Sequence, residues 1–474
     1  MNSVELAFMC QVLLWLVVLG VFLSSGQTSI FHPMGIYLGF HLLVFILRPF
    51  LVIFLGFHSV WDYTGFNPEP EDLIRTLAVS SVGLVVLAVS CLLIGRTRLG
   101  FPEGPLPSFS REQGYALVVI TIMLVPLIAY SIYAAGGDTG AVRAANGVMT
   151  LTKTTGYITD AQFMLAPLLC LWLVKTRFHW LNLVPILLYL AYRTWCGWAR
   201  WTIILFFITL VFQYCWYHRL RWLPAWMLGA AALVFMLFNV IGHNRDMLKT
   251  LLSEGTLVVN QDGTGPGMTV EEKRQQQLDT LDFANFDYLT VVDAIIPKRT
   301  ERYSYGAQYL QLFTEPIPRI LWPGKPAGAP VAFFSLNQYV NFTGLTVSLV
   351  GDGWTSGGWI GVVITMALAG AILGLAHRSF WARSSLPLPS MLYVSFLGIA
   401  PNWFRDGGIS VFKFLMFIWL PLLLLPVVAW FLKGRVVPVR SMLLRPGERL
   451  RVVENATNRA SSGPSPSRTP IKIQ

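Results

Sequence analysis

The chain has 474 residues, of which 54% are hydrophobic and only 12% are charged. Soluble domains carry about 25% charged residues, so this composition excludes an ordinary soluble protein. The formal net charge of +11 does not call for nucleic-acid binding, because short connections and the C-terminal tail hold most of the excess basic residues.

Apolar segments recur from one end of the chain to the other, and about 20 apolar residues suffice for a helix to cross a bilayer. The sequence therefore predicts an all-α polytopic integral membrane protein with about eleven transmembrane helices. The first span has no basic stretch before it and no small-residue cleavage site, so we interpret it as retained. The predicted spans are 5–25, 34–57, 72–95, 114–135, 161–175, 179–193, 201–218, 223–242, 357–376, 385–402 and 410–432.

Basic residues gather in alternate connections, and the positive-inside rule places those connections in the cytoplasm. The segments 136–160, 194–201 and 243–357 then face outward, and the C-terminus is cytoplasmic. The connections hold Arg96, Arg98, Arg111, Lys175, Arg177, Arg219, Arg221, Arg378 and Arg383.

This topology divides the chain into four parts. Residues 1–242 form an N-terminal bundle of about eight spans, and residues 243–357 form a large, partly helical extracytoplasmic loop. A C-terminal bundle of about three spans follows at 358–432. The basic tail, 433–474, is polar and rich in Ser, Pro and Asn, which is typical of disorder.

Several arginines on the predicted outer side are not explained by the positive-inside rule, which accounts only for basic residues on the cytoplasmic side. Arg193 and Arg200 lie in "AYRTWCGWARWTIILFFITL" with no acidic neighbour, and Arg48 lies inside "HLLVFILRPFLVIFLGF", followed by Pro49. An arginine within a span is costly and marks a functional site by default. The alternative for Arg193 and Arg200 is that they extend to the outer headgroups.

The long loop contains two informative stretches. Thr269 and Glu272 form a capping box, and a helix is expected from there to about Ile296. Its apolar face packs on the membrane domain in our interpretation, or else lies in the membrane interface; it comprises Leu278, Leu281, Leu289, Val292 and Ile295.

Further along the loop, "EPIPRILWPGKPAGAP" holds Arg319 and Lys325 on a proline-stiffened backbone. Arginine binds phosphate with a two-pronged fork and lysine with a point charge. The outward side thus collects many cations and few carboxylates, which suits the diphosphate head of a lipid. The cations are Arg48, Arg143, Arg200, Arg245, Arg319, Lys325 and Arg405, and the carboxylates are Asp246, Glu315, Asp352 and Asp406.

Metal and disulfide chemistry find no support in the sequence. The five cysteines fall in or beside apolar segments, and the seven histidines form no metal-binding pair. We therefore expect no metal and no cofactor.

The chain resembles the bacterial oligosaccharide repeat-unit polymerases, the Wzy-type O-antigen and exopolysaccharide polymerases. The resemblance is carried by "FILRPF" in an early span, "GWAR" between two middle spans, "PRILWPGKP" in the loop, "GLTVSLVGDGWTSGGWIG" at its end, and the turn "RDGG". It implies a GT-C-like membrane fold in the bacterial inner membrane with a periplasmic active site. It also implies a glycosyltransferase that moves a growing glycan from undecaprenyl diphosphate to the terminal sugar of a new lipid-linked repeat unit. Partners would be that lipid-linked oligosaccharide, the bilayer, a chain-length regulator and other envelope assembly proteins.

Under this resemblance we expect Arg200, Arg319 and Asp352 to be catalytic, with Asp352 as general base and Asp406 as second choice. Arg245 beside Asp246 has an alternative interpretation as a simple ion pair. Trp322, Trp354 and Tyr305 would stack on sugars, although aromatic residues also anchor membrane proteins at the interface. The diphosphate-binding residues would be Arg48, Arg200, Arg245, Arg319, Lys325 and Arg405.

Other functions remain open at this point. An O-antigen ligase, which transfers glycan to lipid A core, would share the fold and the donor. Such ligases have a histidine in their outer loop, whereas this loop contains none beyond His243, so we favour the polymerase. A flippase or transporter of the same lipid-linked sugar would have internal repeats, and none is evident. A structural scaffold would leave the outer arginines unexplained.

Overall fold

The structure is a computed structural model of the chain. It describes residues 2–101, 109–136, 141–143, 149–151, 156–196, 200–227, 229, 284–314, 322, 333–340, 346 and 348–433.

The described part is a helical bundle, in which 7 helices are long and apolar enough to cross a membrane. They are α1 (Ser3–Ser24), the continuous α2 (Pro33–His41), η1 (Leu42–Leu47) and α3 (Arg48–Leu55), α5 (Pro70–Ile94), α6 (Arg111–Gly136), the continuous α7 (Gly156–Asp160), η2 (Ala161–Met164) and α8 (Leu165–Lys175), α17 (Ser348–Ala382), and α19 (Gly408–Leu432). The chain is therefore a multi-pass helical membrane protein.

The remaining predicted spans coincide with shorter or more polar helices. These are α9 (Leu183–Cys196), α10 (Arg200–Tyr217) and α18 (Pro387–Asp406), and most of 223–242 lies outside the described residues. The expected total of about eleven therefore stays a prediction. The other elements are α4 (Ser59–Thr64), η3 (Trp180–Asn182), α14 (Asn285–Ile295), η5 (Ala307–Leu310), α15 (Gln311–Thr314) and η6 (Leu336–Gln338).

Within the described residues, the strands form one small hairpin. β1 (Ala141–Arg143) pairs antiparallel with β2 (Met149–Leu151), with Val142 opposite Thr150. The hairpin belongs to the segment 136–160 that we expect on the outer side.

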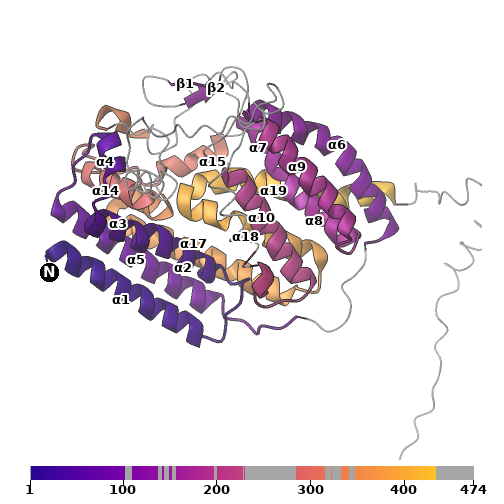
Figure 1. The fold of residues 1–474 in the computed structure, drawn as a ribbon, viewed down its shortest axis with the longest axis horizontal. Helices are drawn as coiled ribbons and strands as arrows, with labels where there is room; N and C mark the ends of the chain where they lie inside the picture. Colours follow the sequence, from indigo (N-terminus) through magenta and orange to yellow (C-terminus); the bar gives the residue numbers. More distant parts are fainter. Residues whose placement is uncertain are drawn as a thin grey trace, which may run out of the picture.

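The helices of the bundle run alongside one another, and α17 packs most extensively on α5 and then on α18 (Figure 1). Two glycines allow the approach of α17 to α5. A Cβ atom at Gly370 would lie 2.6 Å from the carbonyl oxygen of Leu87, and one at Gly374 would lie 2.8 Å from that of Cys91. Small residues serve in this way where membrane helices meet backbone to backbone.

Connections that the topology places on the same side also touch in the structure. Gln27 donates to the carbonyl of Thr97 at 2.7 Å, and the Nε of Arg221 donates to the carbonyl of Thr28 at 2.9 Å. Those three connections are among the ones that the predicted topology places in the cytoplasm. At the other end, Lys413 pairs with Asp160 at 2.6 Å, and both are predicted to lie on the outer side.

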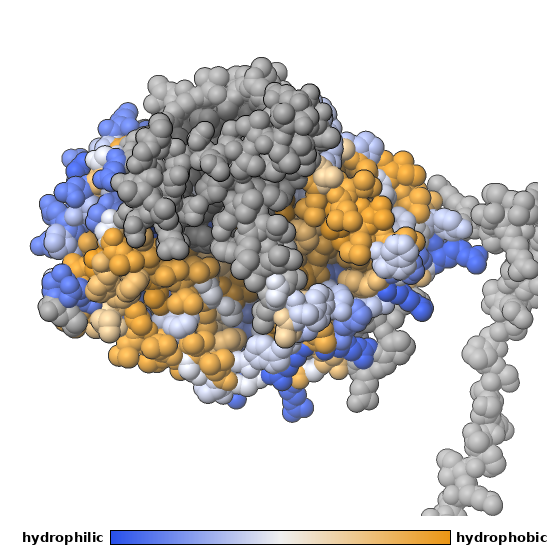
Figure 2. Space-filling view, viewed as in Figure 1, coloured by the Kyte–Doolittle hydropathy of each residue, from blue (hydrophilic) through white to orange (hydrophobic). Residues whose placement is uncertain are grey.

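The surface of the bundle is strongly apolar. Large side chains such as Leu93 and Ile122 are 72% and 69% exposed, and Figure 2 shows hydrophobic residues over the middle of the face, with hydrophilic ones toward its left edge and lower right. An exposed apolar surface of this kind is suited to contact with lipid.

The helix α14 is enclosed by the bundle. It packs on α5, α17 and η1, and its polar residues Asp287, Thr290 and Asp293 are as buried as Leu289, Val292 and Ile295. The expectation that this segment packs on the membrane domain is thus confirmed for Asn285–Ile295. The capping box at Thr269 and Glu272, with Leu278 and Leu281, lies outside the described residues.

Candidate functional site

A sharp break in α17 creates the local architecture of the site. Gly357 and Gly358 leave the helical conformation, and Gly358 has a φ of +59°, which favours glycine. Beyond the break the chain folds back on itself, because a Cβ at Gly353 would lie 2.8 Å from the Cα of Val362. The Gly-rich run thus carries a short helical arm, 348–356, against the start of the longer part of α17.

Asp352 lies on this arm and joins it to the turn between α18 and α19. Its Oδ2 atom accepts a hydrogen bond of 2.7 Å from the backbone N–H of Gly408, and the side chain is 3% exposed. Gly407 has a φ of +85°, and a Cβ there would overlap the Asp352 carboxylate. The motifs "VGDGW" and "RDGG" therefore meet, and Gly407 is needed where they do.

A segment of the long loop closes over the arm. Gln308 donates from its Nε2 to the hydroxyl of Ser356 at 2.9 Å and to the carbonyl of Asp352 at 3.3 Å, and Ser304 donates from its backbone N–H to the carbonyl of Thr355 at 2.9 Å. Both Gln308 and Ser304 are buried. We call Ser304, Gln308, Tyr309, Asp352, Gly407 and Gly408 the Asp352 site.

Tyr309 places a phenol at this site. Its ring lies next to Gly408, where a Cβ would be 3.1 Å from Cε1. Burial and then the nearby Asp352 carboxylate raise the pKa of Tyr309 well above its usual value. The phenol therefore keeps its proton and can donate a hydrogen bond.

Asn285 connects the start of α14 to the same region. Its Nδ2 atom lies 2.9 Å from the hydroxyl of Thr346 and 3.0 Å from the carbonyl of Arg405. Arg405 lies 3.7 Å from Asp406 and is 14% exposed. The structure thus brings together three of the predicted residues, Asp352, Arg405 and Asp406.

Arg48, by contrast, is occupied by a protein carboxylate. Its Nε and Nη2 atoms donate to Asp287 at 2.7 and 3.0 Å, and the side chains are 2% and 0% exposed. The helix turns π-helical at η1 directly before Arg48 and Pro49, a common response to a lost backbone hydrogen bond. The expected diphosphate contact of Arg48 is therefore replaced by a structural ion pair.

The other predicted cations are only partly described. Arg200 begins α10 and Arg143 ends β1, but their side chains lie outside the described part. Arg245, Arg319 and Lys325 lie outside the described residues altogether, as do Asp246 and Glu315.

The three aromatic candidates differ in exposure. Trp354 is 4% exposed and its Nε1 donates to the carbonyl of Ile296 at 2.9 Å, so it packs in the interior and offers no face to a sugar. This position does not favour stacking of Trp354 on a sugar. Tyr305 is 81% exposed and Trp322 39% exposed, and both are available for stacking.

Arg193 is buried, and no carboxylate among the described residues pairs with it. The side chain is 2% exposed, its Nη1 atom lies 3.5 Å from the carbonyl of Ile132, and its Nε has no hydrogen-bond partner among the described residues. A buried guanidinium normally has a charged partner, because removing it from water costs several kcal/mol.

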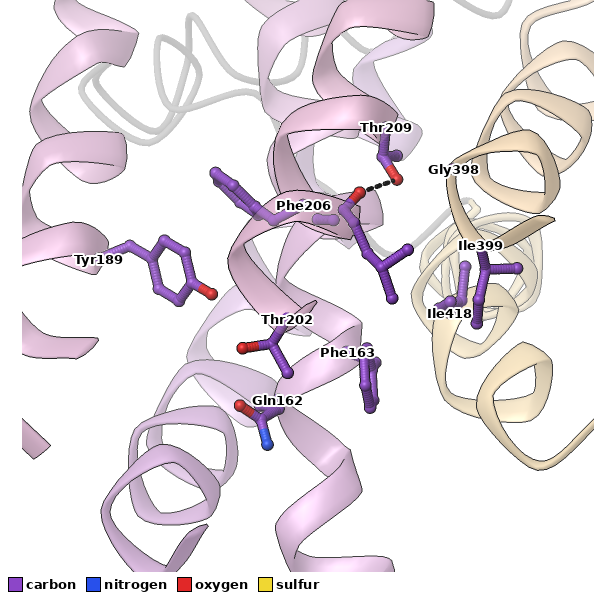
Figure 3. Close-up of a pocket in the computed structure, with 11 residues that line it drawn as sticks. Gln162, Phe163, Tyr189, Thr202, Phe206, Thr209, Gly398, Ile399 and Ile418 are labelled. Carbon is purple, nitrogen blue, oxygen red and sulfur yellow. Dashed lines mark hydrogen bonds between the residues drawn. The ribbon is translucent and has the colours of Figure 1, made fainter. Parts of the chain in front are cut away.

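A small cavity lies near Arg193, between α8, α9, α10, α18 and α19 (Figure 3). Its volume is about 20 Å³, and Gln162, Tyr189 and Thr202 form its polar side. This is room for about one water molecule. The cavity cannot hold a sugar or a phosphate.

A charged cluster that the sequence analysis missed fixes α14 to the start of α5. The Nε of Arg75 lies 2.6 Å from Asp293 and its Nη2 lies 2.6 Å from Asp72, while Lys298 lies 3.2 Å from Asp72. Burial raises the pKa of Asp293 to about 7, although Arg75 opposes this shift. The signal available in the sequence was the pair of acidic residues, Asp287 and Asp293, on an otherwise apolar helix.

Comparison of the chain with known proteins gives no relative. No family model, no curated protein and no solved structure matches it. In the part of the chain that the structure describes, no three His, Cys, Asp or Glu residues gather in a way that would hold a metal ion.

Proposed function

We propose that the chain is a membrane glycosyltransferase that polymerises lipid-linked oligosaccharide repeat units. It transfers a growing glycan from undecaprenyl diphosphate to the terminal sugar of a new lipid-linked unit. The observation that carries this proposal is the hydrogen bond between Asp352 and Gly408, because it joins two of the segments on which the resemblance to Wzy-type polymerases rests. The bilayer is the natural environment of both substrates.

In the proposed reaction, the acceptor hydroxyl attacks the anomeric carbon of the donor sugar. The new bond joins the acceptor oxygen to this carbon, while the bond from the carbon to the phosphate oxygen breaks and its electrons leave with the diphosphate. Asp352 accepts the hydroxyl proton as general base, with Asp406 as the second candidate. Tyr309 lies close enough for the Asp352 charge to raise its pKa, and its phenol would donate a hydrogen bond to the reacting sugar.

Cations would stabilise the leaving diphosphate, whose negative charge increases as the bond breaks. We assign this role to Arg200, Arg319 and Lys325, with Arg245 and Arg405 beside them. Arg193 joins this group, because no carboxylate among the described residues balances its buried charge, and an anionic ligand would do so. Arg48 is left out, since Asp287 already neutralises it.

Asp352 is almost fully enclosed, so the acceptor sugar has to displace the segment 303–310 to reach it. Hydrogen bonds from Ser304 and Gln308 hold this segment. Binding of the acceptor would exchange these contacts for contacts with sugar hydroxyls. A movement of this kind admits the substrate and afterwards excludes water.

The test is complementation of a polymerase-deficient bacterial strain with Arg200→Ala, Arg319→Ala, Asp352→Ala and, as a matched carboxylate control, Asp62→Ala. Asp62 lies on α4 and is exposed. We expect the first three variants to leave single repeat units on lipid A, with Asp62→Ala giving normal chain lengths. Complete loss of surface glycan would instead indicate a ligase or a flippase.

A further inference from the structure

An apolar groove runs along the C-terminal helices. It has a volume of about 580 Å³, which is within the range of about 300–1,000 Å³ found for small-molecule sites. It lies between α17, α18 and α19 and has an almost entirely apolar lining, with Ile372, Ala376, Leu392, Phe396, Leu415 and Met416 among the residues that form it.

The groove is longer than one leaflet of a bilayer. Its lining follows α18 from Pro389 to Trp403, and these fourteen helical steps of 1.5 Å span about 21 Å. The hydrocarbon core is about 30 Å thick, so a lipid in one leaflet extends through only about half of that. An occupant that fills the groove therefore needs a chain longer than that of an ordinary phospholipid.

One end of the groove has an unused hydrogen-bond donor. Trp403 lines this end, is 4% exposed, and its indole Nε1 has no partner among the described residues. A Cβ at Gly408 would lie 3.9 Å from that Nε1 atom. The donor is thus next to the backbone N–H that holds Asp352. A buried N–H without an acceptor is unfavourable, and an oxygen of a ligand headgroup would accept a hydrogen bond from it.

The opposite end has a different character. Arg383 lines it and donates from its Nη1 to the hydroxyl of Ser379 at 2.8 Å. A phospholipid with its headgroup on Arg383 would enter from the side that we expect to be cytoplasmic, and its acyl chain would end before Trp403. The unpartnered donor would then stay unsatisfied.

We propose that this groove binds the hydrocarbon chain of a long-chain isoprenoid lipid, with an oxygen of its phosphate head accepting a hydrogen bond from Trp403 Nε1. The inference rests on the proposed function, because it places the tail of the lipid-linked substrate and leads its head to Asp352. The groove opens sideways to the bilayer, where Met416 and Phe412 are exposed, so the lipid can enter without leaving the membrane.

The test uses the full-length protein in detergent micelles and a polyprenyl phosphate that carries a photoreactive diazirine on its chain. Irradiation followed by peptide mass spectrometry should locate the label on α17, α18 and α19. Ala376→Trp fills the groove and should lower labelling by about tenfold, as overpacking of a site does. Leu375→Trp is the control, because Leu375 is 56% exposed and does not line the groove.

Trp403→Phe keeps the ring but removes the donor, and should weaken binding about ten- to a hundredfold, the effect of one hydrogen bond to a charged group. Unlabelled polyprenyl phosphate should compete with the probe, while phosphatidylglycerol should not. Equal competition by the two lipids would mean a general bilayer-lipid site and would overturn the inference. Label found on other helices of the wild-type protein would overturn it as well.

Labelling requires no turnover, so it separates the inference from the proposed function. Labelling in the groove together with normal chain lengths in Arg200→Ala, Arg319→Ala and Asp352→Ala would reject the polymerase mechanism and leave the lipid site intact. Labelling elsewhere, together with shortened chains in those variants, would reject the groove alone.

Discussion

Arg48 and Asp287 form a two-point ion pair in the interior of the bundle, with distances of 2.7 and 3.0 Å between nitrogen and oxygen. The arginine belongs to the second predicted span, and the aspartate belongs to a helix of the long loop. The pair therefore fixes the loop to the membrane domain.

Replacing only one partner of this ion pair should destabilise the protein strongly. Arg48→Met or Asp287→Leu leaves one buried charge without its partner, which costs about 3–5 kcal/mol. The double variant removes both charges and should regain most of this loss. Thermal unfolding of the purified variants in detergent checks the expectation, and a double variant as unstable as the sum of the single ones would contradict it.

The same substitution at Arg193 should have the opposite effect on stability. Arg193→Met removes a buried charge that no carboxylate in the described part of the chain balances, so the free energy of unfolding should rise, by up to about 4 kcal/mol. Glycan chain length in the complementation assay should nevertheless fall, because the arginine is available for an anionic ligand. If Arg193→Met is both less stable and fully active, the arginine is structural.

Gly407→Ala should displace Asp352. The residue has a φ of +85° and its Cβ would overlap the carboxylate, and a strained backbone of this kind costs about 1–3 kcal/mol. We expect short glycan chains and a lower melting temperature. Gly20→Ala is the control, since a Cβ there would have nothing within 4 Å. Equal activity of the two variants would argue against a role for the Asp352 geometry.

Trp354 and Tyr305 should separate stability from sugar binding. Trp354→Phe leaves the carbonyl of Ile296 without its donor and should lower the free energy of unfolding by about 1–3 kcal/mol. Tyr305→Ala changes an exposed side chain, so stability should stay within about 0.5 kcal/mol while glycan chains become shorter. Normal chain length in Tyr305→Ala would remove this residue from the sugar-binding set.

The protein should lose stability as the pH rises toward neutrality, because Asp293 loses its proton in this range. Its pKa is raised from 3.8 to about 7 by burial, so between these values the folded state holds a proton that the unfolded state has released. Linkage then lowers the free energy of unfolding as pH increases through this window. Between pH 5 and pH 8 the melting temperature of the wild type should fall by about 2–4 °C more than that of Asp293→Asn. A smaller fall in the wild type would mean that the carboxylate stays ionised beside Arg75.

The sequence predicted a multi-pass helical membrane protein correctly, because long apolar segments with few charges permit little else. It also indicated that the stretch before Ile296 is a helix packed on the membrane domain. The structure also brings together Asp352, Arg405 and Asp406, which the sequence analysis chose from two motifs far apart in the chain, while their role stays a prediction.

Other features depend on contacts that no local pattern encodes. The partner of Arg48 is 239 residues away in the sequence, so the arginine looked unpaired. Trp354 looked like an interfacial ring, but the fold-back at Gly358 moves it into the interior. Hydropathy also predicted a span from 357, whereas α17 begins at Ser348. The nine residues 348–356 are moderately polar, and they form a helical arm that only tertiary contacts stabilise.

The enclosure of α14 has a consequence for how the chain can be divided. The segment 243–357 is not an appendage that could be trimmed to leave a working bundle. Excising it would remove both Asp287 and Asp293, so Arg48 would lose its anion in the interior and Arg75 would keep only Asp72. Any minimal version of this protein therefore has to keep α14, whatever else of the loop is shortened.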